Sequence, residues 1–172
     1  MDPTDLLHST HATLTTLITH LTPAQWHTQP NPESWSPAQI LAHLTAVEEQ
    51  TIARIESLLA QPPSPPEQLA QTEGQDALLL RHVPKRTRQR VPSPPEFAGA
   101  PTSPTPHEAL ARFAAARAQA IALLTRDGLH TRAFPHFAFG PLTCRQWLLM
   151  LAVHTQRHCL QIEAALNPAT PD

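Results

Sequence analysis

Four stretches of the chain carry apolar residues at helical spacing. They span residues 2–21, 36–61, 106–125 and 142–166. In each of them apolar side chains recur every three or four positions, which gathers them on one face of a helix. A helix with one apolar face must bury that face against another element. The pattern therefore predicts an all-α protein built as a four-helix bundle.

Capping residues mark the starts of these helices. A capping side chain precedes a proline at Asp2-Pro3, Ser36-Pro37 and Thr105-Pro106. Proline is favoured in the first helical turn, where its missing N–H is not needed. Thr143 and Gln146 have the three-residue spacing of a capping box at the start of the fourth stretch. Between the first two helices, residues 22–35 read as a connection in which Trp26 and Trp35 are expected to plug the core at one end of the bundle.

Residues 62–106 differ from the rest of the chain because they contain eleven of its 20 prolines. This composition predicts a long, extended crossover between the second and third helices, with at most a helical turn or two before Pro84. The crossover carries a basic cluster, Arg81, Lys85, Arg86, Arg88 and Arg90. A solvated loop is the simpler interpretation of this cluster, and a docking site for an anionic cosubstrate or a partner is the alternative.

Composition narrows the classes of protein to consider. A length of 172 residues with 41% hydrophobic residues suits a single domain, 1–172. A net charge of −2 gives no overall attraction to nucleic acid, and no apolar run reaches membrane-spanning length. Cys144 and Cys159 lie about 22 Å apart along one predicted helix and cannot form a disulfide together. We therefore expect a cytoplasmic protein with reduced thiols.

The fourth stretch places two histidines within an apolar face. His154 and His158 are four residues apart, so on a helix their side chains stand one above the other. Two imidazoles at this spacing can bind one metal ion. The alternative is that each ring simply makes a hydrogen bond inside the core. HTQRH also lacks the glutamate of the H-E-x-x-H protease motif, which argues against that class of metalloprotease.

A third histidine stands on the second predicted helix. His43 lies at the edge of its apolar stripe, on the side that also carries Gln39, Gln50 and Arg54, which indicates either a groove mouth or a solvated face. Together with His154 and His158 it would supply three neutral nitrogen ligands from two facing helices. Three protein ligands leave a coordination position open, as in catalytic sites. Gln161 is a candidate partner for an imidazole N–H, and His136 could line the pocket.

Two segments resemble a known family. ESWSPAQILAHLTAVEE resembles the second-helix signature of the DinB/YfiT-like superfamily, in which a tryptophan and a helix start precede a ligand histidine. FPHFAFGPLTCRQWLLMLAVHTQRHCLQI resembles its C-terminal signature, with a glycine loop, H-x-x-x-H and a following Gln-Ile. The resemblance implies a metal-binding four-helix bundle, often dimeric, with nickel or zinc as the ion. It carries His43, His154 and His158 over as the three ligands.

The resemblance implies the function less specifically. Members of the superfamily include thiol transferases that use bacillithiol or mycothiol, a mycothiol-dependent maleylpyruvate isomerase, and proteins described only as metal-dependent hydrolases. We therefore expect a divalent metal ion to activate a low-molecular-weight thiol or a water against a small electrophilic substrate. The alternative is a non-catalytic, stress-linked bundle that binds a metal or a small ligand. A homodimer is expected in either case, and neither a membrane nor nucleic acid is expected as a partner.

Overall fold

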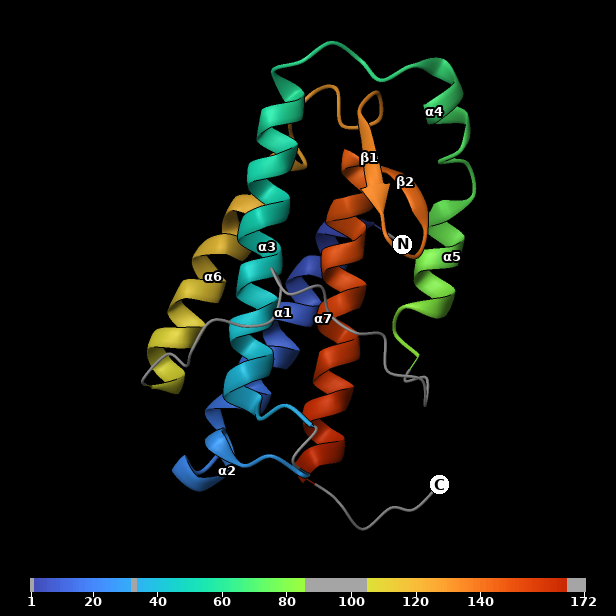
Figure 1. Ribbon diagram of the computed structural model, residues 1–172. Helices are drawn as coiled ribbons and strands as arrows, with labels where there is room; N and C mark the ends of the chain where they lie inside the picture. The colour runs from blue at the N-terminus through green and yellow to red at the C-terminus, as the bar shows by residue number, and fades with distance from the viewer. Residues whose placement is uncertain (1, 32–33, 86–104, 167–172) are drawn as a thin grey trace.

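Four long helices form a bundle, which confirms the predicted fold class. The computed structural model describes residues 2–31, 34–85 and 105–166. The long helices are α1 (Pro3–Thr19), α3 (Pro37–Leu59), α6 (Pro106–Leu123) and α7 (Cys144–Leu166). α7 packs mainly against α1, and α3 packs mainly against α6. α3 and α7 run antiparallel beside one another, with the blue α1 behind them (Figure 1). Residues 86–104, which include Arg86, Arg88 and Arg90, lie outside the described residues.

The predicted capping residues begin the helices as expected. The Ser36 hydroxyl accepts a hydrogen bond from Gln39 N, and Gln39 Oε1 accepts one from Ser36 N. Thr143 and Gln146 make the same pair of bonds at the start of α7, at 2.9 and 3.1 Å. Each box satisfies backbone N–H groups that have no partner within the helix. These bonds fix the start of α3, which carries His43, and the start of α7, which carries the other two histidines.

Three short helices lie outside the four-helix pattern. They are α2 (Pro23–His27), α4 (Pro66–Ala70) and α5 (Gln75–His82). The helical turns expected before Pro84 are present as α4 and α5. The expectation of an extended crossover is wrong for α5, because Leu79 is completely buried and α5 lies against α7 (Figure 1). Leu79 and Val83 belong to the core cluster and so help to hold this segment against the bundle.

A β-hairpin precedes α7. Strands β1 (Ala133–His136) and β2 (Gly140–Thr143) pair antiparallel, with His136 opposite Gly140. Gly140 has φ +72, a left-handed conformation that glycine adopts without steric cost. The side chain of Phe137 is 67% exposed at the turn. Trp147 Nε1 donates to Phe134 O at 3.1 Å, so the hairpin is fixed against the first turns of α7.

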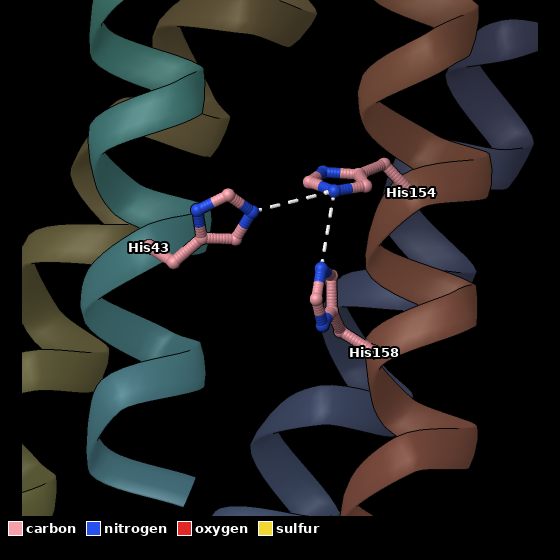
Figure 2. Close-up of side chains that lie close together, drawn as sticks. All are labelled: His43, His154 and His158. Atoms are coloured by element: carbon pink, nitrogen blue, oxygen red, sulfur yellow. Dashed lines mark hydrogen bonds between the residues drawn. The ribbon is translucent and has the colours of Figure 1, made fainter. Parts of the chain in front are cut away.

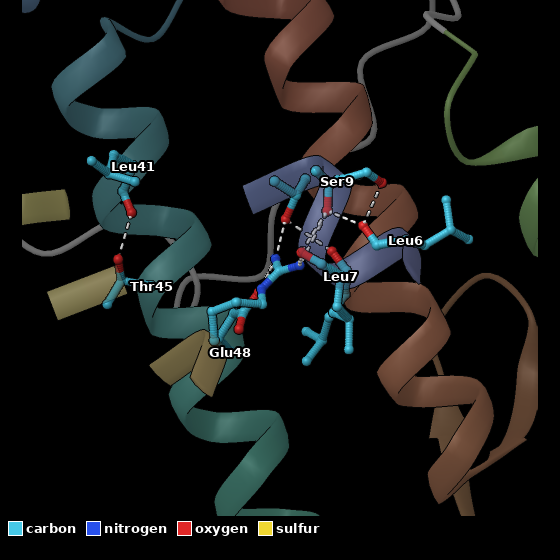
Figure 3. A network of polar contacts seen from close by, with 10 residues as sticks. Leu6, Leu7, Ser9, Leu41, Thr45 and Glu48 are labelled. Carbon is cyan, nitrogen blue, oxygen red and sulfur yellow. Dashed lines mark hydrogen bonds and ion pairs between the residues drawn. The ribbon is translucent and has the colours of Figure 1, made fainter. Parts of the chain in front are cut away.

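A polar layer crosses the core between two apolar clusters. Arg117 of α6 is completely buried and forms an ion pair with Glu48 of α3. Its guanidinium also donates to Leu7 O and Thr10 Oγ1 of α1, and to Thr155 Oγ1 of α7. Figure 3 shows Glu48 reaching from α3 toward this network on α1. One arginine therefore connects all four long helices.

The two apolar clusters lie on either side of this layer. On α3, Leu44 belongs to one cluster and Ile52 to the other, with Glu48 between them. On α6, Phe113 and Ala120 flank Arg117 in the same way. Within the described part of the chain, no helix combines the length and the apolar character needed to cross a membrane.

Candidate metal centre

The structure brings together the three histidines singled out by the sequence. His43 projects from α3, and His154 and His158 project from α7, so that their rings converge between the two helices (Figure 2). One nitrogen from each ring lies within 4.8 Å of the others. The Nε2 atom of His154 is 3.4 Å from Nε2 of His43 and 3.1 Å from Nε2 of His158. Three imidazole nitrogens from two helices thus face one point.

This spacing suits a shared metal ion. Two nitrogens that each lie ~2.0–2.1 Å from a tetrahedral zinc ion are separated by about 3.3 Å. Both measured separations fall close to this value. A single proton on Nε2 of His154 can be directed at only one of the two neighbouring nitrogens, whereas a metal ion can be bound by all three. The donor set therefore fits a divalent cation, with a position left open for another ligand.

Gln161 lies where the sequence predicted a partner for an imidazole. Its Oε1 is 2.9 Å from Nδ1 of His158. Because an amide oxygen only accepts hydrogen bonds, Nδ1 is the protonated nitrogen of the neutral ring. The lone pair of His158 is then on Nε2, which points at the other two rings. This contact holds the ring in the tautomer and orientation that a metal ligand needs.

Burial keeps the two α7 rings uncharged. Burial, and then the charge of His43, lower the pKa of His158 to about 3, although the hydrogen bond with Gln161 acts in the opposite direction. Burial also lowers the pKa of His154 well below its usual range, with smaller contributions from the charges of His158, His43, Arg157 and His136. Neutral imidazole is the form that binds a metal, so these rings are ready to do so at neutral pH.

Trp35 forms a wall of the centre, a role that its sequence position did not reveal. Its ring is stacked on His158 with an interplanar angle of 11° and lies 4.8 Å from the ring centroid of His43. Trp26 is 1% exposed and belongs to the core, as expected. Trp35 also packs against the core cluster, as expected, but it is only half-buried and lies against the histidines. In the sequence, the only indication that Trp35 contacts the histidines was its position shortly before His43.

The other sequence candidates lie outside the cluster. His136 is buried on β1, in ring contact with Trp147. Gln50 and Arg54 are exposed on α3, on the same side of that helix as His43. Arg81 and Lys85 of the basic cluster are exposed. None of these residues belongs to the group of convergent metal-binding atoms found among the described residues.

Comparison with known families agrees with this arrangement. The family model for the DinB superfamily matches residues 6–162, which include both signature segments and all three histidines. The chain belongs to the DinB superfamily. This confirms the resemblance noted in the sequence.

A solved structure supports the same fold for this DinB-superfamily chain. YfiT from Bacillus subtilis, described as "a probable metal-dependent hydrolase with an unusual four-helix bundle topology", superposes with a TM-score of 0.64. The match covers 96% of this chain and 85% of that chain at 18% sequence identity. At this identity the likeness extends to the fold and not to the chemistry. A search of curated proteins finds no significant match.

Proposed function

We propose that this protein is a divalent-metal-dependent enzyme in which His43, His154 and His158 hold the ion. The observation that carries the proposal is the convergence of three imidazole nitrogens within 4.8 Å. Zinc and nickel suit three nitrogen ligands. When bound, the ion would lower the pKa of a water or a thiol toward neutrality and so supply a nucleophile. The description of YfiT as a metal-dependent hydrolase is consistent with this chemistry.

The cysteine thiols and the buried Glu48 carboxylate of this chain bear on which group acts as the nucleophile. Burial raises the pKa of Cys159 to about 12 and that of Cys144 to about 11, so neither thiol ionises at neutral pH. The buried carboxylate nearest in sequence to His43, that of Glu48, is paired with Arg117. We infer that the nucleophile is a water or a low-molecular-weight thiol cosubstrate, attacking a small electrophilic substrate. The homodimer and the cytoplasmic location remain predictions.

Metal analysis of the protein purified without a histidine tag tests the site. We expect about one zinc or nickel ion per chain in the wild type and none in His154→Ala or His158→Ala. His130→Ala, which removes an exposed histidine, is the matched control and should keep the ion. A wild-type protein as free of metal as His154→Ala would overturn the proposal and leave the rings as hydrogen-bonded core residues.

Turnover tests the enzyme assignment separately from metal binding. The metal-loaded protein is incubated with a panel of esters and amides, and with model electrophiles in the presence of bacillithiol or mycothiol. Hydrolysis that is lost in His154→Ala supports water as the nucleophile, and thiol consumption supports transfer. If the loaded protein does neither, the non-catalytic, metal-binding alternative replaces the enzyme.

A further inference from the structure

A pocket lies on the side of α7 that faces away from the histidine cluster, where α1 and α5 both pack against this helix. Its volume is about 440 Å³, within the range of about 300–1,000 Å³ that small-molecule sites occupy. The residues that line it are Leu6, Leu80, Arg81, Pro84, Lys85 and Gln156. Gln156 follows His154 by two residues, which turns its side chain about 200° around the helix from the cluster. A ligand in this pocket would therefore lie apart from the metal centre.

The lining of the pocket divides into an apolar floor and a polar mouth. Its three apolar residues are buried or half-buried, whereas its three polar residues are exposed. Arg81 and Lys85 form no ion pair with any described residue, so no described carboxylate neutralises the two positive charges at the mouth. Gln156 adds an amide at the same mouth, which can donate or accept a hydrogen bond.

The backbone around the pocket is held in place by contacts with the bundle. Arg157 Nη1 donates to Lys85 O at 2.7 Å, which joins the turn after α5 to α7. Leu79 and Val83 belong to the core cluster and anchor the end of α5 on either side of the pocket residues Leu80 and Arg81. Because this wall is already ordered, a ligand would bind without a large entropic cost of ordering the chain.

Charge and polarity together indicate what this pocket can bind. A guanidinium and an ammonium group both make charge-assisted hydrogen bonds to a carboxylate. An apolar chain attached to that carboxylate would cover the floor and remove its surface from water. None of the six lining residues is aromatic, so the bases of a nucleic acid would find no ring to stack on. An amphipathic small molecule with one negative charge matches both parts of the lining.

We propose that this pocket binds a small amphipathic carboxylate, with Arg81 and Lys85 contacting the charged group and the floor contacting the apolar chain. This gives a function to two residues of the basic cluster that the metal centre leaves unused. The inference goes beyond the proposed function and does not depend on it, because none of the pocket residues is a ligand of the ion.

Calorimetry with three probes tests the proposal. Octanoate has both the charge and the chain, butyrate has the charge with a shorter chain, and 1-octanol has the chain without the charge. We expect octanoate to bind about tenfold more tightly than butyrate, a factor that burial of roughly two further methylenes supplies. It should also bind about tenfold more tightly than 1-octanol, because hydrogen bonds to a charged group contribute about that much.

Substitutions at the mouth test which residues select the charge. In the double variant Arg81→Met, Lys85→Met the affinity for octanoate should fall to that for 1-octanol, which should itself stay unchanged. Gln156→Glu places a carboxylate at the mouth and should weaken octanoate binding only. Arg126→Met, which removes an exposed arginine elsewhere, is the control and should bind octanoate as the wild type does. All these residues are exposed, and equal melting temperatures would show that the variants fold.

A chemical measurement locates the bound ligand. Lys85 is the only lysine of the chain, so its acylation by an amine-reactive ester can be followed on a single peptide by mass spectrometry. Octanoate at ten times its Kd should slow this reaction about tenfold, because only about one tenth of the pockets are then free. Butyrate at the same concentration should protect Lys85 much less.

Four outcomes would overturn the proposal. They are a wild type that does not bind octanoate, equal affinities for octanoate and 1-octanol, equal affinities for octanoate and butyrate, and unchanged octanoate binding in the double variant. Equal affinities for octanoate and butyrate would indicate a site for an anion alone, such as an acidic side chain of another protein. Chelator-treated protein should give the same results as metal-loaded protein, so a failure of the proposed function leaves these tests unaffected.

Discussion

Gln161 orients His158 through a single hydrogen bond, and its removal should weaken metal binding without abolishing it. In Gln161→Ala the Nδ1–H of His158 loses its acceptor, so the ring is no longer held with Nε2 toward the centre. We expect zinc affinity to fall about tenfold, the lower end of what such partners contribute. Competition with a chromophoric chelator measures it. Gln156→Ala, exposed on the same helix, is the control, and an equal loss there would contradict the assignment.

The buried imidazoles should make the metal-free protein sensitive to mild acid. Burial lowers the pKa of His136 to about 4 and that of His158 to about 3, whereas both titrate near 6.5 in the unfolded chain. Between these values the unfolded state binds more protons than the folded state, so stability falls as pH decreases. At pH 5 each ring should cost about 2 kcal/mol relative to pH 7.

Urea denaturation of chelator-treated protein between pH 7 and pH 5 measures this effect. The unfolding free energy of the wild type should decrease steadily over that range. His136→Phe removes one of the rings and should show a smaller decrease. A stability that is independent of pH from 7 to 5 would mean that the rings are already charged, or solvated, in the folded protein.

Among single residues, the sequence predicted the three histidines that come together but not all of the side chains around them. His154 and His158 could be paired because helical geometry alone fixes the distance between residues four apart. The same geometry placed Gln161 beside His158. Trp35 could not be placed, because its contact with both helices depends on how a loop of irregular backbone folds back.

Among the elements, α5 and the turn before it are hydrogen-bonded to α7 through Gln146 at the start of α7. Gln146 Nε2 donates to Thr72 O at 2.9 Å and to Asp76 Oδ1 at 2.8 Å. In Gln146→Ala these bonds are lost in a buried setting, so the unfolding free energy should fall by about 1–3 kcal/mol. Hydrogen exchange should accelerate in residues 66–82 and at the start of α7, where the capping bond to Thr143 N is also lost, more than in the rest of α7.

An exposed glutamine supplies the control for this change. Gln71→Ala removes only a local bond to Glu67 O and should leave exchange in residues 66–82 nearly unchanged. Equal acceleration throughout the four long helices of Gln146→Ala would show that the residue stabilises the bundle as a whole, and would contradict a specific role in holding α5.

The long helices were predictable from the sequence, whereas of the short ones only a helical turn or two before Pro84 was expected, for reasons of length. TPAQ at 22–25 has the same capping signal as SPAQ at 36–39, and Thr22 does form the box. However, a helix of five residues has no periodicity to detect and little stability of its own. For α5 a helical turn or two was expected but its packing was not, because Leu79 stands in a proline-rich segment whose composition indicates an extended chain.

For the molecule as a whole, removing one partner of the ion pair between Glu48 and Arg117 should lower the stability strongly. Replacing both partners by apolar residues should lower it much less. Burial raises the pKa of Glu48 even with Arg117 beside it, which shows how strongly the core opposes charge. Glu48→Leu alone leaves a buried guanidinium without its carboxylate and should lower stability by about 3–5 kcal/mol. Glu48→Leu combined with Arg117→Met should restore most of that loss.

A second ion pair between the same two helices is a matched control. Arg112 and Glu49 are joined by two hydrogen bonds of 2.8 and 2.7 Å, but their side chains are 62% and 41% exposed. Removing both should change the unfolding free energy by less than about 1 kcal/mol. Denaturant titrations of both double-mutant cycles give the comparison. A Glu48→Leu cost as small as that of Glu49→Leu would refute the buried network.

The polar layer was not predictable from one sequence. Arg117 shares the buried face of α6, but its partner lies 69 residues away on another helix. To predict this pair, one must know how the helices are ordered and how far each is shifted along its neighbour. The periodicity within each helix does not give this information. The resemblance to a family supplied the order of the bundle, and a structure was needed to align its layers.

The contact of Trp35 with His43 and His158 gives the protein an optical signal of its own. Indole emission responds to the groups that touch the ring, and the other two tryptophans lie in the core and beneath the hairpin. Titrating nickel into the chelated protein should therefore quench the fluorescence of the wild type and not that of Trp35→Phe. Occupancy of the centre could then be followed in unlabelled protein, in real time and at low concentration.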